Sequence, residues 1–505
     1  MKFQRAVAYA AVGSLSFAAG AWLVQRHTDA DTRLYAQARL LDDIVRRVST
    51  LYVDSLNGAD LYQLAVDGLL ENLGDPYAGF FAGDEYDQLT EAISGDYVGI
   101  GVRVELRDGW ITIVAPLPGS PAEAAGLRVG DRIVRVDSVV TFDWTSEQSV
   151  AALRGPPGSV VHLDVRRPGV PEPLPFTLER AEIHENAVRH RELLTPDVGY
   201  VALGIVNEGS ADELRTAIDT LIAGGAGKLI VDLRQNPGGL LNEANRIGDL
   251  FLDRGAEIVE TRSRPGTRVE DFSAREPERW PGVPIVVLVD AYTASAAEIL
   301  AGALQDYDRA LIVGTPTFGK GVVQSVFPVG REAVVKFTTG RWYTPLGRSL
   351  QRVPSPEDSG LVTTPAGRTL RSGGGIMPDV TVETAASATV ALARVFGANL
   401  QALNDVLASV ALDRAGRDST ATGPEPADIG RVREALRSRG VRVSAGQWRT
   451  VRAMVTRRLR YLVLRYAGGT GAEASARLHD DPIVGRALDR LAGARRPADL
   501  FVAPD

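Results

Sequence analysis

The segment IVVLVDAYTASAAEILAGAL, residues 285–304, places a strand pattern directly before a helical pattern. Its first part, Ile285–Val289, is a continuous apolar run of the length of a buried strand. At the start of the helical part, Ser295-Ala-Ala-Glu298 has the form of a capping box, in which each side chain bonds a backbone N–H of the first turn. Ser295 is also a candidate nucleophile, but this segment by itself favours the cap.

Strand and helix patterns alternate across residues 198–345. The strand-like segments are Gly199–Leu203, Lys228–Leu233, Ile285–Val289 and Ala310–Val313. The helical segments are Ser210–Ala223, Asn242–Leu252 and Ser295–Gln305. This alternation predicts an α/β layer in which helices cover a largely parallel sheet.

The regions on either side of this layer have other patterns, as expected for a chain of 505 residues with several domains. Residues 29–94 show a helical pattern whose apolar residues fall on one face: Leu40, Leu41, Ile44, Val45, Val48 and Leu51. Short β-like runs separated by Gly/Pro turns fill residues 96–180, with strands expected at Gly99–Leu106, Trp110–Val114, Asp131–Val136 and Val160–Arg166. A polar stretch, Asp413–Gly430, precedes a final helical tail.

The composition excludes several kinds of site. A net charge of −7 leaves no basic excess for binding phosphates, which disfavours a nucleic-acid partner. The chain has no cysteine, so disulfides, thiolate catalysis and cysteine-bound metal are excluded. Its five histidines form no H-x-x-x-H or HExxH pair, which argues against a zinc site. No metal and no cofactor are expected.

The N-terminus has the pattern of a targeting segment. Lys2 and Arg5 precede an uncharged run, Ala6–Gln25, that is long enough to span a bilayer. We interpret residues 1–27 as a signal peptide or, in preference, an uncleaved membrane anchor. The rest of the chain is then expected in the cell envelope or periplasm, attached to the inner membrane, or secreted if the segment is cleaved.

Lysine is scarce, since only four of the 56 basic residues are lysines. Unlike arginine, a desolvated lysine loses its proton readily enough to act as a general base. Lys320 lies between two glycines in Thr317-Phe318-Gly319-Lys320-Gly321, and an apolar Val pair follows. Gln324 falls on the same side as Lys320 in either a helix or a strand, where it can hold the amine by a hydrogen bond. A solvated turn lysine is the alternative.

Two other chemistries compete for these residues. Gly314-x-x-x-x-Gly319-Lys320 resembles a phosphate-binding P-loop, but Gly321 stands where Mg²⁺ binding needs Ser or Thr, and a β-like run follows in place of a helix. A Ser-His-Asp triad has only His184 and His190 as formal candidates, because residues 198–380 contain no histidine. A Ser–Lys pair, in which the amine takes the hydroxyl proton, is the known alternative to such a triad.

Acyl transfer also needs donors for the developing oxyanion. The buried strand pattern that ends at Leu233 is followed by Arg234-Gln-Asn-Pro-Gly238-Gly239 and then a helix. The N–H groups of Gly238 and Gly239 at this turn, and that of Ala296 after Ser295, are candidate donors. A plain left-handed turn is the alternative for the Gly-Gly pair.

Several ordered motifs together resemble the carboxy-terminal processing peptidases, the tail-specific serine proteases. The motifs are GDYVGIGV at 95–102, GSPAEAAGLRVGDRIVRVD at 119–137, LRGPPGSVVHLDVRR at 153–167, DLRQNPGGLL at 232–241, TASAAEILAGAL at 293–304, GTPTFGKGVVQ at 314–324, YTPLGRSLQ at 343–351 and GGGIMPDV at 373–380. The resemblance implies that Ser295 is the nucleophile, Lys320 the general base and Gln324 the residue that orients it. It also implies oxyanion donors at Gly238, Gly239 and Ala296. On this combination Ser295 is predicted to be the nucleophile, with helix capping as a compatible second role.

The same resemblance implies a PDZ domain at 95–181, inserted in a multidomain α+β chain. Gly99-Ile100-Gly101-Val102 matches the loop that captures a peptide's C-terminal carboxylate. The expected partners are protein substrates with apolar C-terminal tails, together with an adaptor or activator and a second copy of the chain. The other expected parts are a helical region at 28–94, an α/β protease core of the ClpP/crotonase type at 182–385, and a helical extension at 386–505.

This sequence departs from the family pattern in several places. Asp75-Pro76-Tyr77-Ala78 stands where Asp-Pro-His followed by Ser or Thr is common, and Ile205 occupies a position near one that is often aromatic. Residues 352–372 form an insert, interpreted as a flap or a dimer contact. A competing interpretation is a pseudo-protease that uses its PDZ domain only to hold a partner, but the intact Ser, Lys and Gln set argues against it.

Overall fold

The computed structural model describes residues 37–264, 270–330, 333–353, 358–382 and 387–502. The chain divides into two compact units, which are described separately: the residues up to Tyr86 with Gln324–Thr338, and Asp87–Val323 with Thr339–Asp505. The predicted signal peptide or membrane anchor at 1–27 lies outside the described residues.

The larger unit is built on a sheet whose six described strands run in the order β10-β11-β12-β15-β16-β21. Their bounds are β10 Val188–Thr195, β11 Val198–Leu203, β12 Lys228–Asp232, β15 Ile285–Val289, β16 Leu311–Gly314 and β21 Val380–Thr381. All neighbouring pairs from β11 to β21 are parallel, and β10 is antiparallel to β11. The predicted α/β layer is therefore confirmed, including its four expected strands.

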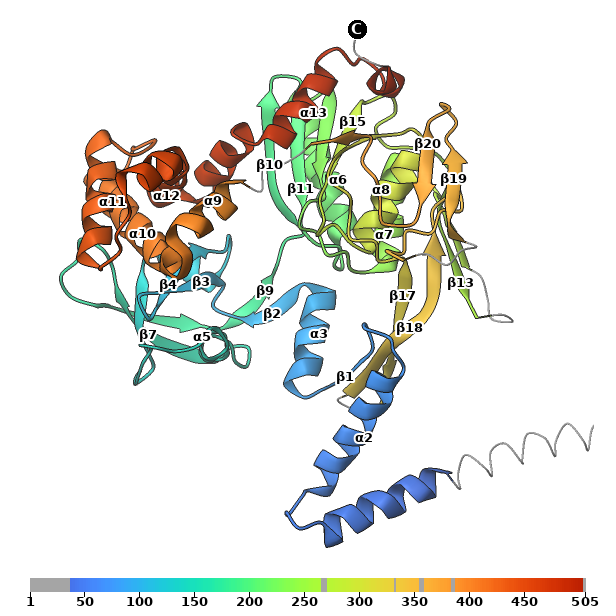
Figure 1. Cartoon of the computed structure of the whole chain (residues 1–505), viewed down its shortest axis with the longest axis horizontal. Coiled ribbons are helices and arrows are strands. Elements are labelled where there is room, and N and C mark those ends of the chain that lie inside the picture. Colours follow the sequence, from blue (N-terminus) through green and yellow to red (C-terminus); the bar gives the residue numbers. More distant parts are fainter. Residues whose placement is uncertain (1–36, 265–269, 331–332, 354–357, 383–386, 503–505) are drawn as a thin grey trace, which may run out of the picture. The chain divides into compact units, whose positions relative to one another are not determined.

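Helices cover both faces of this sheet (Figure 1). On one face lie α6 (Ser210–Ala223), α7 (Leu241–Phe251) and α8 (Ala296–Asp306). On the other face lies α13 (Pro482–Ala492), whose Leu491 packs with Ile230 and Leu288 of the strands. Burial on both faces explains why the central strands read as continuous apolar runs in the sequence. The helix α13 thus belongs to the core layer, although the sequence pattern assigns it to a separate C-terminal extension.

Two smaller β elements border the core. One is a sheet in which β13 (Glu257–Ser263) pairs with β14 (Glu270–Ser273) and with residues 340–343 of β18 (Ala333–Tyr343). The other is a hairpin of β19 (Gly360–Thr363) and β20 (Thr369–Ser372), which forms much of the 352–372 insert.

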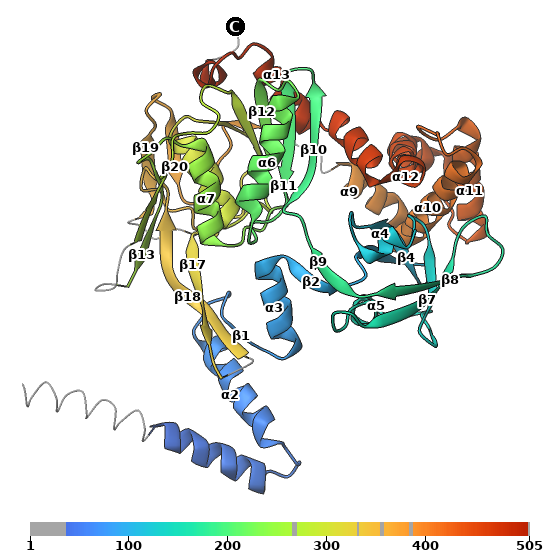
Figure 2. The same ribbon diagram turned by 180° about the vertical axis from the view of Figure 1, so that it is seen from behind.

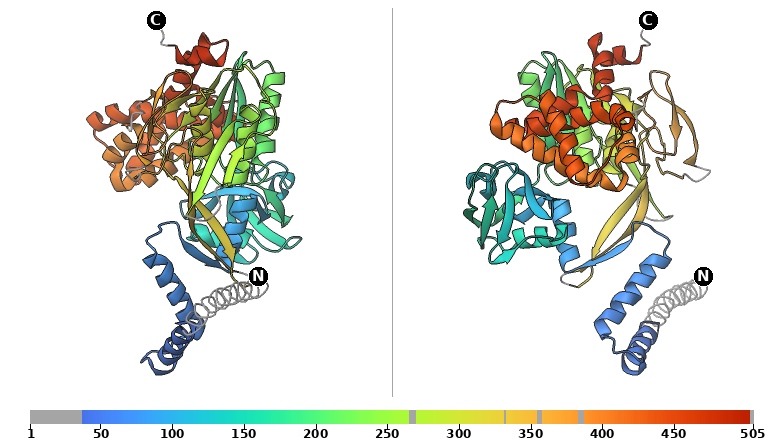
Figure 3. Two further views of the ribbon diagram at one scale, coloured as in Figure 1. Left: turned by 90° about the vertical axis from the view of Figure 1, so that its right-hand side faces the viewer. Right: turned by 60° about the vertical axis from the view of Figure 1, so that its left-hand side comes forward.

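The region expected to be a PDZ domain forms a separate β module with its own apolar core (Figure 3). Its strands are β3 Val102–Arg107, β4 Trp110–Pro116, β5 Arg132–Val136, β6 Val139–Val140, β7 Val160–Arg166 and β8 Leu174–Glu179. Two helices accompany them, α4 (Pro121–Ala124) and α5 (Ser146–Leu153). The entering and leaving segments, β2 (Asp96–Gly99) and β9 (Ala181–His184), pair antiparallel. Three of the four expected strands are present, and the fourth, expected at Gly99–Leu106, begins only at Val102 because Gly101 has a positive φ.

The C-terminal region contains a bundle of helices with a buried apolar interior. The helices are α9 Ser387–Phe396, α10 Leu400–Arg417, α11 Pro426–Ser438 and α12 Ala445–His479. In the described chain the segment Val390–Arg417 is the one stretch long and apolar enough to cross a membrane. Its Phe396, Leu403 and Leu407 are buried in the bundle, so we interpret this segment of α9 and α10 as part of the bundle's apolar core. The expected polar separator starts later than predicted, because α10 continues to Arg417.

The smaller unit contains the helix at 37–51, α2 (Gly58–Asn72) and β1 (Gly79–Ala82), which pairs with β18 (Figure 2). It also holds most of β17 (Val322–Pro328), which pairs with β18. A further helix, α3 (Asp84–Ser94), begins at the edge of this unit. The helices predicted from the apolar pattern are present, although Leu40 and Leu51 on the apolar face remain exposed.

Candidate active site

Ser295 occupies the sharp turn that joins β15 to α8. It is the N-cap residue of α8, and its backbone angles are φ 53° and ψ −118°. Residues other than glycine rarely adopt such a conformation. No side-chain hydrogen bond from Ser295 caps the helix. A strained backbone of this kind is held by its surroundings and is concentrated at functional sites. The predicted capping box is present in its Glu298 half, because the Glu298 carboxylate accepts the N–H of Ser295 over 2.9 Å.

The turn is fastened to the neighbouring turn after β12. The Thr293 hydroxyl donates to the carbonyl of Leu233 over 2.9 Å, and the Ala294 N–H donates to the carbonyl of Asn236 over 3.0 Å. The side-chain amide of Asn236 in turn donates to the carbonyl of Leu203 over 2.9 Å. These turns follow the carboxyl ends of adjacent parallel strands, the edge where open α/β sheets place their sites.

Glu298 joins the serine segment to the lysine segment. Its carboxylate is fully buried and accepts four hydrogen bonds: from the N–H groups of Ser295, Gly319 and Lys320 at 2.8–2.9 Å, and from the Thr317 hydroxyl at 2.5 Å. Burial raises the pKa of Glu298, while the hydrogen bonds from Thr317, Lys320, Gly319 and Ser295 oppose that rise. The sequence indicated Glu298 only as part of a capping box. Its contacts beyond Ser295 follow from tertiary structure.

The loop after β16 carries Lys320, which is half-buried. The N–H of Phe318 donates to the carbonyl of Thr293 over 3.0 Å, which ties this loop to the turn before Ser295. On the other side, the Trp342 indole donates to the carbonyl of Lys320 over 3.1 Å. Gln324 belongs to the smaller unit, where its side-chain amide donates to the carbonyl of Tyr77 over 2.9 Å. The expected pairing of Gln324 with Lys320 stays a prediction.

The candidate oxyanion donors lie in the turns described above. Gly238 packs so closely on the nucleophile turn that a Cβ on it would lie 2.8 Å from Ser295 Cβ and 2.8 Å from the nitrogen of Ala296. The N–H of Gly238 itself donates to the side-chain oxygen of Asn236 over 2.8 Å. The N–H groups of Gly239 and Ala296 have no acceptor among the described residues. Of the three predicted donors, these two have an N–H that is free for a ligand.

The Gly99–Val102 loop is held by hydrogen bonds from other residues of the same β module. The carbonyl of Gly101 accepts from the N–H of Leu117 at 2.8 Å and from the Ser120 hydroxyl at 3.0 Å, and the carbonyl of Ile100 accepts from the N–H of Ala122 at 2.9 Å. Gly101 has φ 74°, and a Cβ there would lie 2.3 Å from that of Ser120. Glycine is required at this position by both conformation and space.

The two histidines that precede the core are held by carboxylates. Nδ1 of His184 lies 2.7 Å from Asp96, and its Nε2 lies 2.9 Å from Glu213. The side chain of His190 bonds Glu192 over 3.0 Å. None of these described hydrogen bonds joins either histidine to Ser295, as a triad would require.

Comparisons with known proteins identify both modules. Residues 197–382 match the model of peptidase family S41, and residues 112–167 match a PDZ domain. A carboxy-terminal-processing protease of Bartonella bacilliformis is 36% identical over 330 residues, which cover 65% of this chain and 75% of that protein. The carboxy-terminal processing protease CtpA of Bacillus subtilis is 34% identical over 62% of this chain and 66% of its own.

Solved structures give similar matches. The photosystem II D1 C-terminal processing protease is 28% identical, covers 67% of this chain and 86% of its own, and has a TM-score of 0.38. The PDZ domain of a Vibrio cholerae carboxy-terminal protease, solved with a peptide, is 30% identical over 18% of this chain and 99% of its own, with a TM-score of 0.17. The length and identity of the match to the Bartonella protein show that this chain belongs to peptidase family S41, as a serine protease of the carboxy-terminal processing type with a PDZ domain.

Proposed function

We propose that Ser295 is the nucleophile and Lys320 the general base of an endopeptidase that cuts polypeptides through an acyl-enzyme. The observation that carries this proposal is the sharing of Glu298, whose carboxylate accepts the backbone N–H groups of both residues. The strained backbone of Ser295, together with the absence of a cap bond from its side chain, supports the assignment.

The reaction begins when the neutral amine of Lys320 takes the proton of the Ser295 hydroxyl. The Ser295 Oγ attacks the carbonyl carbon of the scissile bond, and the tetrahedral intermediate collapses with release of the amine, which takes the proton from Lys320. Water then attacks the acyl-enzyme, with Lys320 again as base. To act as this base, Lys320 must be partly neutral at working pH.

The negative charge of the intermediate is assigned to backbone donors at the turn beside Ser295. Gly239 and Ala296 have the N–H groups that no described residue occupies. Gly238, predicted as a third donor, supports the site through its close approach to Ser295. Gln324 is proposed to orient Lys320 through its side-chain carbonyl.

The PDZ domain is proposed to bind the C-terminal tail of the substrate at Gly99-Ile100-Gly101-Val102. A tail that adds as a strand beside this loop presents its carboxylate to backbone N–H groups and its apolar side chains to the module's core. The buried Ile100 at the loop supports an apolar preference. The protein is proposed to act in the cell envelope, held by its N-terminal segment and working with an adaptor or a second copy.

The proposal is tested by incubating the full-length protein with an unfolded protein that has an apolar C-terminus and reading the fragments by mass spectrometry. Ser295→Ala and Lys320→Ala are run in parallel. We expect fragments only from the parent chain. Fragments from either variant at the parent rate would overturn the assignment of the dyad.

A further inference from the structure

The insert at 352–372 builds a pocket that the catalytic assignment does not use. Its hairpin, β19 and β20, stands at one side of a cavity of about 440 Å³, within the range of ligand sites in proteins. The residues that line this cavity include Arg352, Leu361, Arg371, Ser372, Gly374 and Met377. Apolar side chains and two arginines therefore line the same space.

This pocket borders the segment that carries Lys320. The N–H of Arg352 donates to the carbonyl of Gly319 over 2.9 Å, and its guanidinium carbon lies 5.4 Å from the centre of the Phe318 ring. Gly374, which also lines the pocket, donates its N–H to the carbonyl of Gln351 over 3.0 Å. The pocket therefore adjoins the loop that carries Lys320.

Positive charge collects in this pocket. Neither Arg352 nor Arg371 has a carboxylate partner among the described residues, and none of the described residues lining the cavity is acidic. The nearby carboxylates are already engaged, because Asp358 pairs with Arg341 at 3.4 Å and Asp379 pairs with Arg368. A planar guanidinium binds a carboxylate through paired N–H donors, so the two arginines suit an anionic ligand.

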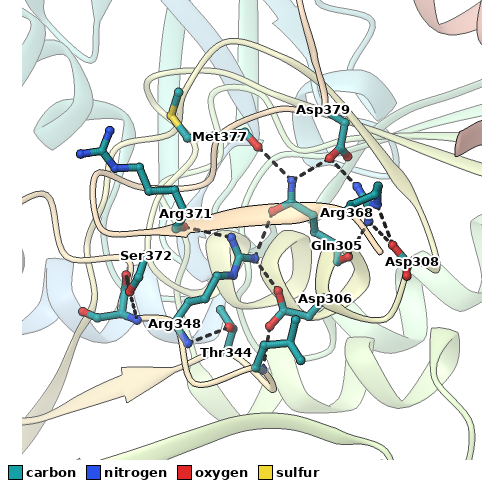
Figure 4. Close-up of polar contacts among 12 residues, drawn as sticks. Gln305, Asp306, Asp308, Thr344, Arg348, Arg368, Arg371, Ser372, Met377 and Asp379 are labelled. Atoms are coloured by element: carbon teal, nitrogen blue, oxygen red, sulfur yellow. Dashed lines mark hydrogen bonds and ion pairs between the residues drawn. The ribbon is translucent and has the colours of Figure 1, made fainter. Parts of the chain in front are cut away.

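The wall that carries Arg371 is fastened to the helix that begins at Ser295 (Figure 4). Arg368, just before β20, pairs with Asp308 at 2.6 Å and donates to the carbonyl of Gln305 at 2.7 Å. The buried Arg348 pairs with Asp306 at 2.6 Å and donates to the carbonyl of Arg371 at 3.4 Å. Gln305 and Asp306 close the C-terminal turn of α8. In Figure 4 the Arg371 side chain points away from this cluster, which leaves its guanidinium available.

We propose that this pocket is a substrate subsite in which Arg371 and Arg352 bind a carboxylate of the polypeptide being cut. The inference rests on the proposed function, since the substrate must cross Ser295. The apolar wall formed by Leu361 and Met377 suits the methylene groups of an acidic side chain, so Glu or Asp near the cut site is the favoured ligand. A free C-terminal carboxylate has the same chemistry and is the second source.

The test uses C-terminally amidated fluorogenic peptides in which one Glu is moved through the positions around the cut, each paired with its Gln counterpart. At one position we expect kcat/KM for the Glu peptide to exceed that for the Gln peptide about 5- to 10-fold, as for a partly exposed charged hydrogen bond. Arg371→Gln and Arg352→Gln should bring this ratio close to one, and Arg371→Glu should shift the preference to a Lys peptide. The same series with a free C-terminus separates the two sources of the carboxylate.

The matched control is Arg254→Gln, which removes one arginine from an exposed ion pair with Glu276. This variant should leave the ratio of kcat/KM between the Glu and Gln peptides unchanged. A ratio near one at every position in the parent chain, or one that Arg371→Glu does not alter, would overturn the inference. Absence of any cleavage would contradict the proposed function instead. In that case the subsite is tested by the binding of the same peptides to Ser295→Ala, measured by fluorescence anisotropy. Tighter binding of the Glu peptide would support the subsite, and equal affinity of the Glu and Gln peptides would refute it.

Discussion

Ser295 and Lys320 donate their backbone N–H groups to the same oxygen atom, Oε2 of Glu298, each over 2.9 Å. Glu298 thus fixes the relative position of two loops that follow different strands of the core sheet. The contact acts on the backbone, so it positions both residues without occupying either reactive side chain. Glu298 is therefore the element that brings the proposed dyad together.

Replacing Glu298 with Gln should disrupt this arrangement. The amide keeps one acceptor oxygen and turns its NH₂ group toward N–H donors, so at least one buried hydrogen bond is lost. Bonds to a charged acceptor contribute about 1.5–3 kcal/mol each, and we expect kcat to fall about 10²-fold. Steady-state kinetics on a fluorogenic peptide checks this. Thr317→Val removes one donor to the same carboxylate and the acceptor of the Ile376 N–H, but it leaves Glu298 charged with its three backbone donors. We therefore expect a smaller loss of kcat than in Glu298→Gln, and an equal loss would contradict this.

Gly238 should not accept a side chain. Its φ is 91°, and a Cβ would approach Ala294 O to 2.6 Å and Ser295 Cβ to 2.8 Å, so Gly238→Ala must displace the nucleophile turn. We expect cleavage activity to fall at least about 10²-fold, since small misplacements of reacting groups have effects of that size. Gly227→Ala is the control, because a Cβ on Gly227 would meet no atom within 4 Å and its φ is ordinary. Full activity in Gly238→Ala would refute the close packing.

His184 should make stability depend on pH. Hydrogen bonds to Glu213 and then to Asp96 raise the pKa of His184 above its ordinary value near 6.5. Its contribution is therefore fully present below the ordinary pKa and is lost as pH rises through the raised pKa of the folded state. We expect the parent chain to have a higher Tm than His184→Gln at low pH and the two to converge as pH rises. The contribution is modest, because the side chain is 41% exposed. A Tm difference that grows with pH would contradict this.

The ion pair of Arg348 with Asp306 should be costly to break. The two side chains are 1% and 0% exposed, and their nearest charged atoms lie 2.6 Å apart. Asp306→Ala leaves the guanidinium buried without its partner, and we expect it to lower the free energy of unfolding by about 3–5 kcal/mol. The double variant Asp306→Leu with Arg348→Met should lose less, because it removes both charges. Urea unfolding of the single and double variants measures this, and a larger loss in the double variant would contradict it.

Most of the core sheet could be predicted from the sequence, because the strands are buried on both faces and read as apolar runs such as Ile285–Val289. The same segment indicated a cap or a nucleophile at Ser295, and the structure places it at the N-cap without a side-chain cap bond. The roles of Glu298 and of α13 could not be predicted. Four hydrogen bonds to one carboxylate depend on loops distant in sequence, and an amphipathic pattern does not say which sheet face a helix covers.

The insert at 352–372, interpreted from the sequence as a flap or a dimer contact, contains a hairpin that Arg368 and Arg348 fasten to the end of α8. This fastening could not be predicted, because the partners Gln305, Asp306 and Asp308 lie far upstream and resemble ordinary residues of a helix end. Whether the insert also contacts a second copy stays a prediction.

The central claim, that Lys320 activates Ser295, is tested most directly by reaction with a serine-directed fluorophosphonate, with the labelled residue identified by peptide mass mapping. The parent chain, Lys320→Ala and Ser295→Ala are treated alike. The proposed dyad predicts that the parent is labelled at Ser295, that Lys320→Ala is labelled at least about 10²-fold more slowly because its general base is missing, and that Ser295→Ala is not labelled. Labelling of Ser295 at the parent rate in Lys320→Ala, or labelling at another residue, would contradict it.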